Sequence, residues 1–264
     1  MTTLRWDQVG ERTFETGVDR GVLYLPNVFG VAWNGLSSLS EKSSGNEPTA
    51  LYFDGVKYAD TPNGQEFVGT LRAFTYPDEF LECEGVYDAV DGFFVTGQQP
   101  SRFGLSYRTL TGNDEDGVSG YKIHVLYNLL AIPVGKAYQS ASPSFDPVVF
   151  EWSLTAIPEA VPGFRPTAHF IFDSRKMAPL LLQDLENSLY GDGITEPHLP
   201  SASTLVSFIS DWVLIRITDH GDGTWTAEGG DNLVYLTDAT SFAINQANAR
   251  YLDGDTYVIS DLTY

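Results

Sequence analysis

The sequence predicts a mainly β protein built on an antiparallel sheet, and three observations support this prediction. Four segments alternate apolar and polar residues with a period of two, which is the pattern of half-buried antiparallel strands. The chain also contains 25 glycines and 14 prolines, a composition that suits short strands joined by turns. One segment has a clear helical period, so we expect one flanking α-helix. The alternating segments are 65–76, 102–109, 121–128 and 148–155.

In each alternating segment the apolar side chains share one face of the strand. That face needs a second layer to cover it, so we expect the four strands to belong to one sandwich. The expected apolar faces hold Phe67, Gly69, Leu71, Ala73, Phe103, Leu105, Tyr107, Tyr121, Ile123, Val125, Tyr127, Phe150, Trp152 and Leu154. The expected polar faces hold Glu66, Thr70, Arg72, Arg102, Ser106, Arg108, Lys122, His124, Asn128, Glu151 and Ser153.

The helix is expected between Pro179, which suits a first helical position, and Gly191, which suits the position just past the end. Its apolar stripe should pack on the outside of the sandwich. A second short helix is expected after Pro200, and 191–203 reads as a flexible connector between the two. The stripe consists of Leu181, Leu182, Leu185 and Leu189.

The sequence pattern changes at Trp212, after which short runs of alternating apolar and polar residues follow one another at close intervals. We therefore expect two domains, a larger one at 1–210 and a small C-terminal all-β module at 211–264. The module is rich in acidic residues and has turn signals of its own, which predicts an independently solvated unit.

Charge and composition exclude several classes of protein. The 264 residues include 15 Lys and Arg and 35 Asp and Glu, which gives a net charge of −20. This charge argues against a nucleic-acid-binding surface, because such surfaces need Lys and Arg to neutralise phosphates. The single cysteine, Cys83, excludes an internal disulfide framework and cysteine-rich zinc sites. No segment has the length and apolarity of a membrane span, and the N-terminal residues lack the apolar core of a signal peptide. We expect no membrane association and no export.

No motif in the sequence points to catalysis, a cofactor or a metal. The four histidines, which have no metal-binding spacing, are His124, His169, His198 and His220, and His124 is interpreted as structural. The Asp-rich turns do not fit a calcium-binding loop. Cys83 lies between Glu82 and Glu84, whose charges disfavour a thiolate. We therefore predict no enzyme activity, no cofactor, and no catalytic, cofactor-binding or metal-ligating residues.

A series of short motifs occurs in one order along most of the chain. These motifs are Trp6, Gly10-Glu11-Arg12, Phe14-Glu15-Thr16-Gly17-Val18-Asp19-Arg20-Gly21-Val22-Leu23-Tyr24, Trp33-Asn34-Gly35-Leu36, Ser44-Gly45, Glu47-Pro48-Thr49, Tyr76-Pro77-Asp78-Glu79-Phe80, Phe103-Gly104-Leu105-Ser106-Tyr107-Arg108-Thr109, Gly112-Asn113-Asp114, Gly120-Tyr121-Lys122-Ile123-His124, Ile217-Thr218-Asp219 and Gly221-Asp222-Gly223-Thr224-Trp225. Together they resemble the major tail proteins of long-tailed, non-contractile actinobacteriophages. The resemblance is weakest across 137–150 and 191–210.

The resemblance implies a tail tube subunit with a β-sandwich or barrel core and a flanking helix. It further implies that six copies form a ring and that rings stack into a tube through which the DNA genome passes. The implied partners are other copies of the chain, the tape measure and tail terminator proteins, and double-stranded DNA in transit without tight binding. The implied location is the virion tail, assembled in the host cytoplasm. The alternative is a tail-associated cell-wall hydrolase or a receptor- or carbohydrate-binding virion protein.

Some residues are candidates for contacts in such a tube. We expect 1–24 and a long loop from Ser37 to Tyr58, with the apolar pair Tyr52 and Phe53, to touch neighbouring subunits or rings. A net acidic lumen would repel DNA toward the axis, and Glu66 and Glu151 are candidates to line it. Basic residues in the first half pair either within the chain or with neighbouring copies, and the sequence does not decide between these. They are Arg5, Arg12, Arg20, Arg102, Arg108, Lys122 and Lys136.

Overall fold

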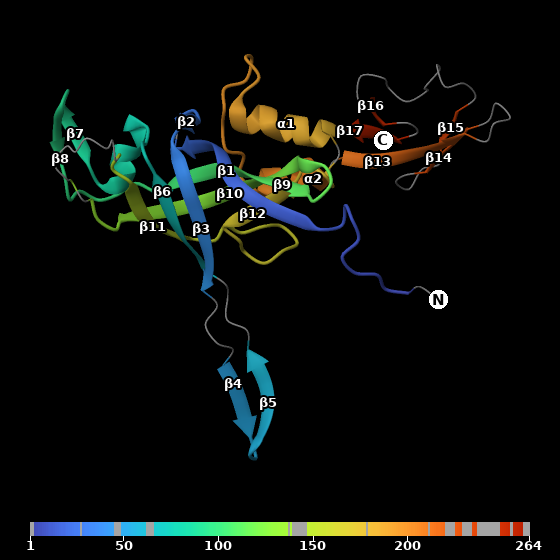
Figure 1. The fold of residues 1–264 in the computed structure, drawn as a ribbon, viewed down its shortest axis with the longest axis horizontal. Helices are drawn as coiled ribbons and strands as arrows, with labels where there is room; N and C mark the ends of the chain where they lie inside the picture. Colours follow the sequence, from blue (N-terminus) through green and yellow to red (C-terminus); the bar gives the residue numbers. More distant parts are fainter. Residues whose placement is uncertain are drawn as a thin grey trace.

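The computed structural model confirms the mainly β prediction (Figure 1). Its described residues form one eight-stranded sheet, one five-stranded sheet, two separate hairpins, two α-helices and one short 3-10 helix. The structure describes residues 3–26, 28–44, 49–61, 66–136, 138, 147–177, 179–210, 212–219, 225–228, 234–236, 249–253 and 256–260.

The eight-stranded sheet contains all four alternating segments, and its strand pairs are antiparallel. Its order is β2-β1-β9-β10-β11-β6-β3, with β12 paired to β10 beside this path. β3, at one end of this path, also contacts β1, the second strand from the other end, so the sheet curves around an interior. The strands are β1 (Thr13–Tyr24), β2 (Val31–Trp33), β3 (Leu36–Ser44), β6 (Glu66–Ala73), β9 (Phe103–Asn113), β10 (Gly117–Pro133), β11 (Phe150–Ala156) and β12 (His169–Asp173).

The long strand β10 is shared between two partners on the same side. Its Lys122–Leu126 part pairs with β12, and its Leu129–Pro133 part pairs with β11. Between the two parts the register with β9 shifts, and Asn128 has a positive φ of 51°, a conformation that a short polar side chain tolerates. The irregularity lets one strand serve both halves of the sheet.

The main core fills the interior enclosed by this sheet. Trp152 is fully buried and lies 5.2 Å from the Phe80 ring and 5.8 Å from the Trp33 ring, measured between centroids. Phe80 comes from the 3-10 helix η1 (Asp78–Glu84), which packs beside β10. The expected inward residues Leu71, Ala73, Phe103, Leu105, Tyr107, Trp152 and Leu154 all belong to this core, as predicted.

Two helices cover the opposite face of the sheet at β1, β10 and β12. α1 (Pro179–Tyr190) confirms the predicted helix and its place outside the main core, and α2 (Ala202–Ser210) confirms the second (Figure 1). The helix stripe and the sheet residues that face it form a second core of Val22, Tyr24, Ile123, Val125, Tyr127, Val161, Phe172, Leu182, Leu185, Leu189, Ala202 and Leu205. This cover explains why Ser106, on an expected polar face, is fully buried and lies 3.0 Å from the Tyr24 hydroxyl.

The connector between the helices is hydrogen-bonded to β10, to α1 and to the segment before β2 rather than flexible, which corrects the sequence expectation. The Gly30 N–H donates to the Pro197 carbonyl at 2.6 Å, and the Tyr127 hydroxyl donates to the Pro200 carbonyl at 2.7 Å. The His198 N–H donates to the Ser188 carbonyl at 2.8 Å. The Gly and Pro content of a segment does not reveal hydrogen bonds of this kind, because the partners of Pro197 and Pro200 lie far away in the sequence.

The expected long loop from Ser37 to Tyr58 is also corrected. The segment forms most of β3 and then the hairpin of β4 (Thr49–Phe53) and β5 (Val56–Thr61), which projects away from the sheet (Figure 1). Asp54 and Gly55 both have positive φ, at 51° and 76°, which is the pattern of a tight type I′ hairpin turn. The Asp-Gly pair was the sequence signal for this turn.

The remaining elements are a second hairpin and the C-terminal sheet. β7 (Tyr87–Val90) pairs only with β8 (Phe93–Val95) among the described strands. The C-terminal sheet has the order β15-β14-β13-β17-β16 and matches the short strands expected after Trp212, while the domain boundary itself stays a prediction. No helix in the described part of the chain is long and apolar enough to cross a membrane. The C-terminal strands are β13 (Trp212–Asp219), β14 (Trp225–Glu228), β15 (Val234–Leu236), β16 (Ala249–Asp253) and β17 (Thr256–Ser260).

Candidate assembly interface

Exposed large apolar side chains cluster on three extensions of the main sheet. The extensions are the arm that precedes β1, the β4–β5 hairpin and the β7–β8 hairpin, and they leave the sheet in different directions (Figure 1). Single exposed apolar residues are ordinary, but groups of them on projecting elements mark surfaces that partners cover. Their exposed apolar residues are Leu4, Trp6, Val9, Phe53, Val56, Tyr58, Tyr87, Val90, Phe93, Phe94 and Val95.

The β4–β5 hairpin has no partner strand beyond its own pair among the described elements. Phe53 is 61% exposed and Tyr58 is 77% exposed, and their rings meet edge to face with centroids 5.4 Å apart. The predicted contact residue Tyr52 pairs with Lys57 in the hairpin register, and its side chain lies outside the described residues. An isolated two-stranded hairpin is marginally stable in water, so this hairpin is suited to contact a second surface.

The β7–β8 hairpin repeats this arrangement at another edge of the molecule. Every residue of both strands is exposed, including Phe93 and Phe94 on opposite faces of the same strand. Aromatic side chains stabilise a strand mainly when apolar surface is buried. Because neither face of this strand is buried within the chain, its aromatic residues stabilise it only if a partner covers one face.

The outer face of β3, β6 and β11 is polar and is not part of the second core under the helices. Here Arg72 and Glu151 are cross-strand neighbours, and Arg72 Nε donates to Glu151 Oε2 at 2.7 Å. The charge of the predicted lumen residue Glu151 is therefore balanced within the chain. The Glu66 side chain, the other candidate for the lumen, lies outside the described residues.

Several of the basic residues pair within the chain. Arg108 makes two hydrogen bonds of 2.8 Å to the carboxylate of Asp19, and these bonds hold the pKa of Asp19 below its usual value. Lys136 Nζ lies 3.0 Å from the buried carboxylate of Glu84. The two further pairs are Lys122 with Glu15 and Arg12 with Asp114. For these four residues the structure favours pairing within the chain over pairing with neighbouring copies.

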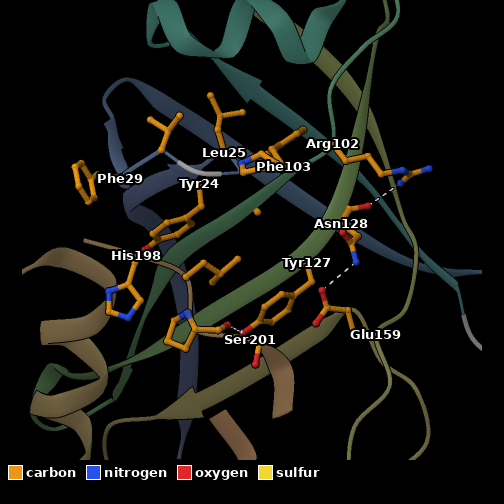
Figure 2. A pocket seen from close by; sticks show the side chains of 15 residues that line it. Tyr24, Leu25, Phe29, Arg102, Phe103, Tyr127, Asn128, Glu159, His198 and Ser201 are labelled. Carbon is orange, nitrogen blue, oxygen red and sulfur yellow. Dashed lines mark hydrogen bonds between the residues drawn. The ribbon is translucent and has the colours of Figure 1, made fainter. Parts of the chain in front are cut away.

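The pocket drawn in Figure 2 has a volume of about 540 Å³ and lies where β1 ends, beside the irregularity of β10. Its polar groups bind one another: Arg102 donates to the Asn128 carbonyl at 2.8 Å, and Asn128 Nδ2 donates to Glu159 Oε1 at 3.0 Å (Figure 2). These bonds fix the chain around the β10 irregularity. They have a structural role and do not arrange a nucleophile beside a base.

Cys83 lies on η1, and its side chain is fully buried in the main core. Burial, followed by the charges of Glu82 and Glu84, raises the pKa of this thiol to about 12. The thiol is therefore protonated at physiological pH and packs as an apolar side chain.

One cluster was missed by the sequence analysis. Glu41, His124 and His169 come from three strands, yet their potential ligand atoms all lie within 4.8 Å of one another. His124 and His169 have no metal-binding spacing in the sequence, but the fold brings their rings together. Motif spacing could not reveal this cluster, because the pairing of β10 with β12 joins residues 45 positions apart.

Comparisons with known proteins give low similarities. No family model matches the sequence, and a search of curated proteins finds no relative. Among solved structures, the anti-feeding prophage tube-terminating cap is 14% identical with a TM-score of 0.31, and the alignment covers 66% of this chain and 97% of that chain. A sheath–tube complex of an extracellular contractile injection system in its extended state is 15% identical with a TM-score of 0.28, covering 58% and 88%. Values this low establish neither a shared function nor a shared family.

Proposed function

We propose that the chain is a structural subunit of a long-tailed phage that assembles into stacked hexameric rings, which form the tail tube. The observation that supports this most directly is the set of three apolar extensions that leave one sheet in different directions. A subunit in a stacked ring needs contacts both around the ring and between rings, so it needs several separate contact surfaces. The resemblance of the sequence motifs to major tail proteins supports the same function.

In this proposal the polar outer face of β3, β6 and β11 forms the lumen wall. The helices cover the other half of the sheet, so this face is the part free to join a continuous inner sheet. Closing a sheet around a ring removes edges that would otherwise aggregate. Glu66 and Glu151 remain the proposed lumen residues, and Arg72 reduces the contribution of Glu151 to a negative lining.

The proposed partners are further copies of the chain, the tape measure and tail terminator proteins, and DNA that passes without tight binding. The proposed location is the virion tail, assembled in the host cytoplasm. We propose no enzymatic role. The alternative is a cell-wall hydrolase or a receptor- or carbohydrate-binding protein. The pocket in Figure 2 gives it no specific support, because Arg102, Asn128 and Glu159 in that pocket are hydrogen-bonded to one another.

The experiment that tests the proposal is negative-stain electron microscopy of the purified chain at rising concentration, combined with size-exclusion chromatography. We expect rings or tubes of uniform diameter. A chain that stays monomeric at high concentration and lowers the turbidity of host cell walls would contradict the proposal and favour the hydrolase.

The hairpin is tested in the same assay with the double variant Phe53→Ser, Tyr58→Ser. Both side chains are exposed, so we expect the free energy of unfolding to change by no more than about 0.5 kcal/mol per site while assembly is lost. Ile194→Ser is the matched control, because Ile194 is 94% exposed but lies on the connector after α1. Normal tubes from the double variant would remove the hairpin from the interface.

A further inference from the structure

Three potential metal ligands from three strands meet inside the sandwich. Glu41 lies on β3, His124 on β10 and His169 on β12. His124 Nδ1 lies 3.1 Å from His169 Nε2 and 3.4 Å from Glu41 Oε1. The two histidines are diagonal neighbours on one face of the β10–β12 pair, and Glu41 reaches them from the opposite layer.

These separations fit the geometry of a tetrahedral zinc site. Zinc–nitrogen bonds of about 2.0–2.1 Å at tetrahedral angles place neighbouring ligand atoms about 3.3 Å apart. The two measured separations lie on either side of that value. Two imidazoles and one carboxylate are a ligand set that zinc accepts, with a fourth position for water.

Neighbouring groups hold His124 in the orientation that binding requires. Its Nε2 lies 3.1 Å from Thr109 Oγ1, and the Thr109 hydroxyl donates to Glu15. Because Thr109 uses its proton on Glu15, its oxygen is free to accept one from His124 Nε2, which leaves the Nδ1 lone pair for a metal. In known metal sites, a histidine that binds the ion typically donates its other ring N–H to a hydrogen-bond acceptor, as His124 does to Thr109.

Tyr107 orients both His124 and Glu41. Its ring stacks on His124 with centroids 4.6 Å apart and an angle of 9° between the planes, and its hydroxyl donates to Glu41 Oε1. The Phe67 ring packs edge to face on His169 with centroids 5.6 Å apart. The ligands are therefore held in place by packing before any ion arrives.

The cluster is reached from solvent on the side of Glu41. The Glu41 side chain is 35% exposed, which gives an ion a route from solvent, whereas the His124 side chain is 6% exposed.

We infer that Glu41, His124 and His169 bind one divalent transition-metal ion, of which Zn²⁺ fits the ligand set best. The ion would tie β3 to β10 and β12 across the sandwich. Since β3 leads toward the β4–β5 hairpin, the ion would also fix the strand from which that hairpin projects (Figure 1). The inference rests on the ligand geometry and does not depend on the proposed function.

The test uses the full chain after treatment with a chelator. Zn²⁺ is titrated against a competing chromophoric chelator, and Co²⁺ is titrated with detection of its visible absorption. We expect one ion per chain, the intense absorption of tetrahedral Co²⁺, and a rise in Tm that a chelator reverses. His169→Ala should weaken binding by more than about 100-fold, and Thr109→Val, which removes the support of His124, by about 10–100-fold.

Two further variants separate loss of metal binding from loss of folding. Glu41→Gln changes a partly exposed ligand, so the protein should fold while it loses the Co²⁺ absorption. His198→Ala is the matched control, because His198 is exposed and lies on the connector away from the cluster, and it should bind as the unaltered chain does. Absence of one-to-one binding by the unaltered chain, or equal losses in His198→Ala and His169→Ala, would overturn the inference. Tube formation, measured separately by microscopy, can succeed whether or not the ion binds.

Discussion

At the scale of single residues, the indole N–H groups of the two buried tryptophans in the main core both have hydrogen-bond partners. The Trp152 indole N–H donates to Glu84, whose carboxylate also binds Lys136. The Trp33 indole N–H donates to the Thr75 carbonyl at 2.9 Å. Large aromatic residues can fill the main core because their polar atoms find partners at its rim.

Cys83 gives a prediction about reactivity. In the folded protein the thiol is buried and has a pKa of about 12, so it should not react with a maleimide or with Ellman's reagent at pH 8. It should react once the chain is unfolded in denaturant. Gln99→Cys provides the control, because this exposed position should react in the folded state. Rapid labelling of Cys83 in the folded protein would contradict its burial.

The same thiol contributes to the pH dependence of stability, and the sign follows from the direction of its shift. The unfolded thiol ionises near its ordinary pKa of about 8.5, whereas the folded thiol keeps its proton up to about 12. Unfolding therefore releases a proton between these values, so the contribution of Cys83 to stability falls as pH rises above about 8.5. Chemical denaturation at pH 7 and pH 10 should show a smaller loss of stability in Cys83→Ala than in the unaltered chain.

At the scale of elements, α1 illustrates how one stripe of leucines fixes a helix on a sheet. Leu189 is fully buried against the second core, while Gln183 on the same helix is exposed. Leu189→Ala should lower the free energy of unfolding by about 2–5 kcal/mol, because it removes buried apolar atoms and leaves a cavity. Gln183→Ala, the control, should change it by less than about 0.5 kcal/mol. Denaturant titration measures both, and equal effects would show that α1 is not packed as described.

The tight turn of the β4–β5 hairpin gives a second prediction at this scale. Gly55 has a φ of 76° and no atom near the position of an added Cβ, so Gly55→Val introduces backbone strain without a clash. We expect the Tm of the main body to stay the same while assembly is impaired, because the strain is confined to the projecting hairpin.

Gly163→Val is the matched control, since Gly163 also has a positive φ, of 77°, and open space around it, but lies in the loop that follows β11. Both variants would be compared by thermal denaturation and by negative-stain microscopy. If both assemble equally well, the hairpin conformation has no part in assembly.

At the scale of the whole molecule, truncation tests whether the C-terminal sheet is a separate module. We predict that residues 211–264 form a separate module on the outside of the assembly. A chain truncated after Ser210 should remain soluble and form rings, because both cores of the larger domain are built from residues before 210. An insoluble truncated chain would mean that the module is integral to the fold.

The proposed lumen gives a prediction for assembled tubes. Basic contacts repeated at every ring would hold DNA, because each neutralised phosphate releases counterions. On the proposed lumen face, Arg72 is paired with Glu151, so this base is not free for phosphates. We expect assembled tubes to show no tight, salt-sensitive binding of duplex DNA in a filter-binding or sedimentation assay. Such binding would overturn the proposed lining.

The sequence by itself determined the elements whose signal is local. The inward faces of β6, β9 and β11 followed from a period of two, and the stripe of α1 followed from a period of 3.6, because both patterns repeat within one element. The direction of the pKa shift of Cys83 was also predicted: burial is its larger cause, but Glu82 and Glu84, its immediate neighbours, raise the pKa in the same direction.

Only the tertiary structure decided which distant residues meet. The sequence placed His124 on a polar face, but that face is the interior of the sandwich, where His169 and Glu41 reach it from other strands. In the same way, the pairing of β1 with β9 places Arg108 beside Asp19. Lys136, just after β10, meets Glu84 of η1 through tertiary packing, and no spacing in the sequence indicates either pair. The physical reason is that register and layer packing are set by the sum of many contacts across the sheet, and no single segment contains that information.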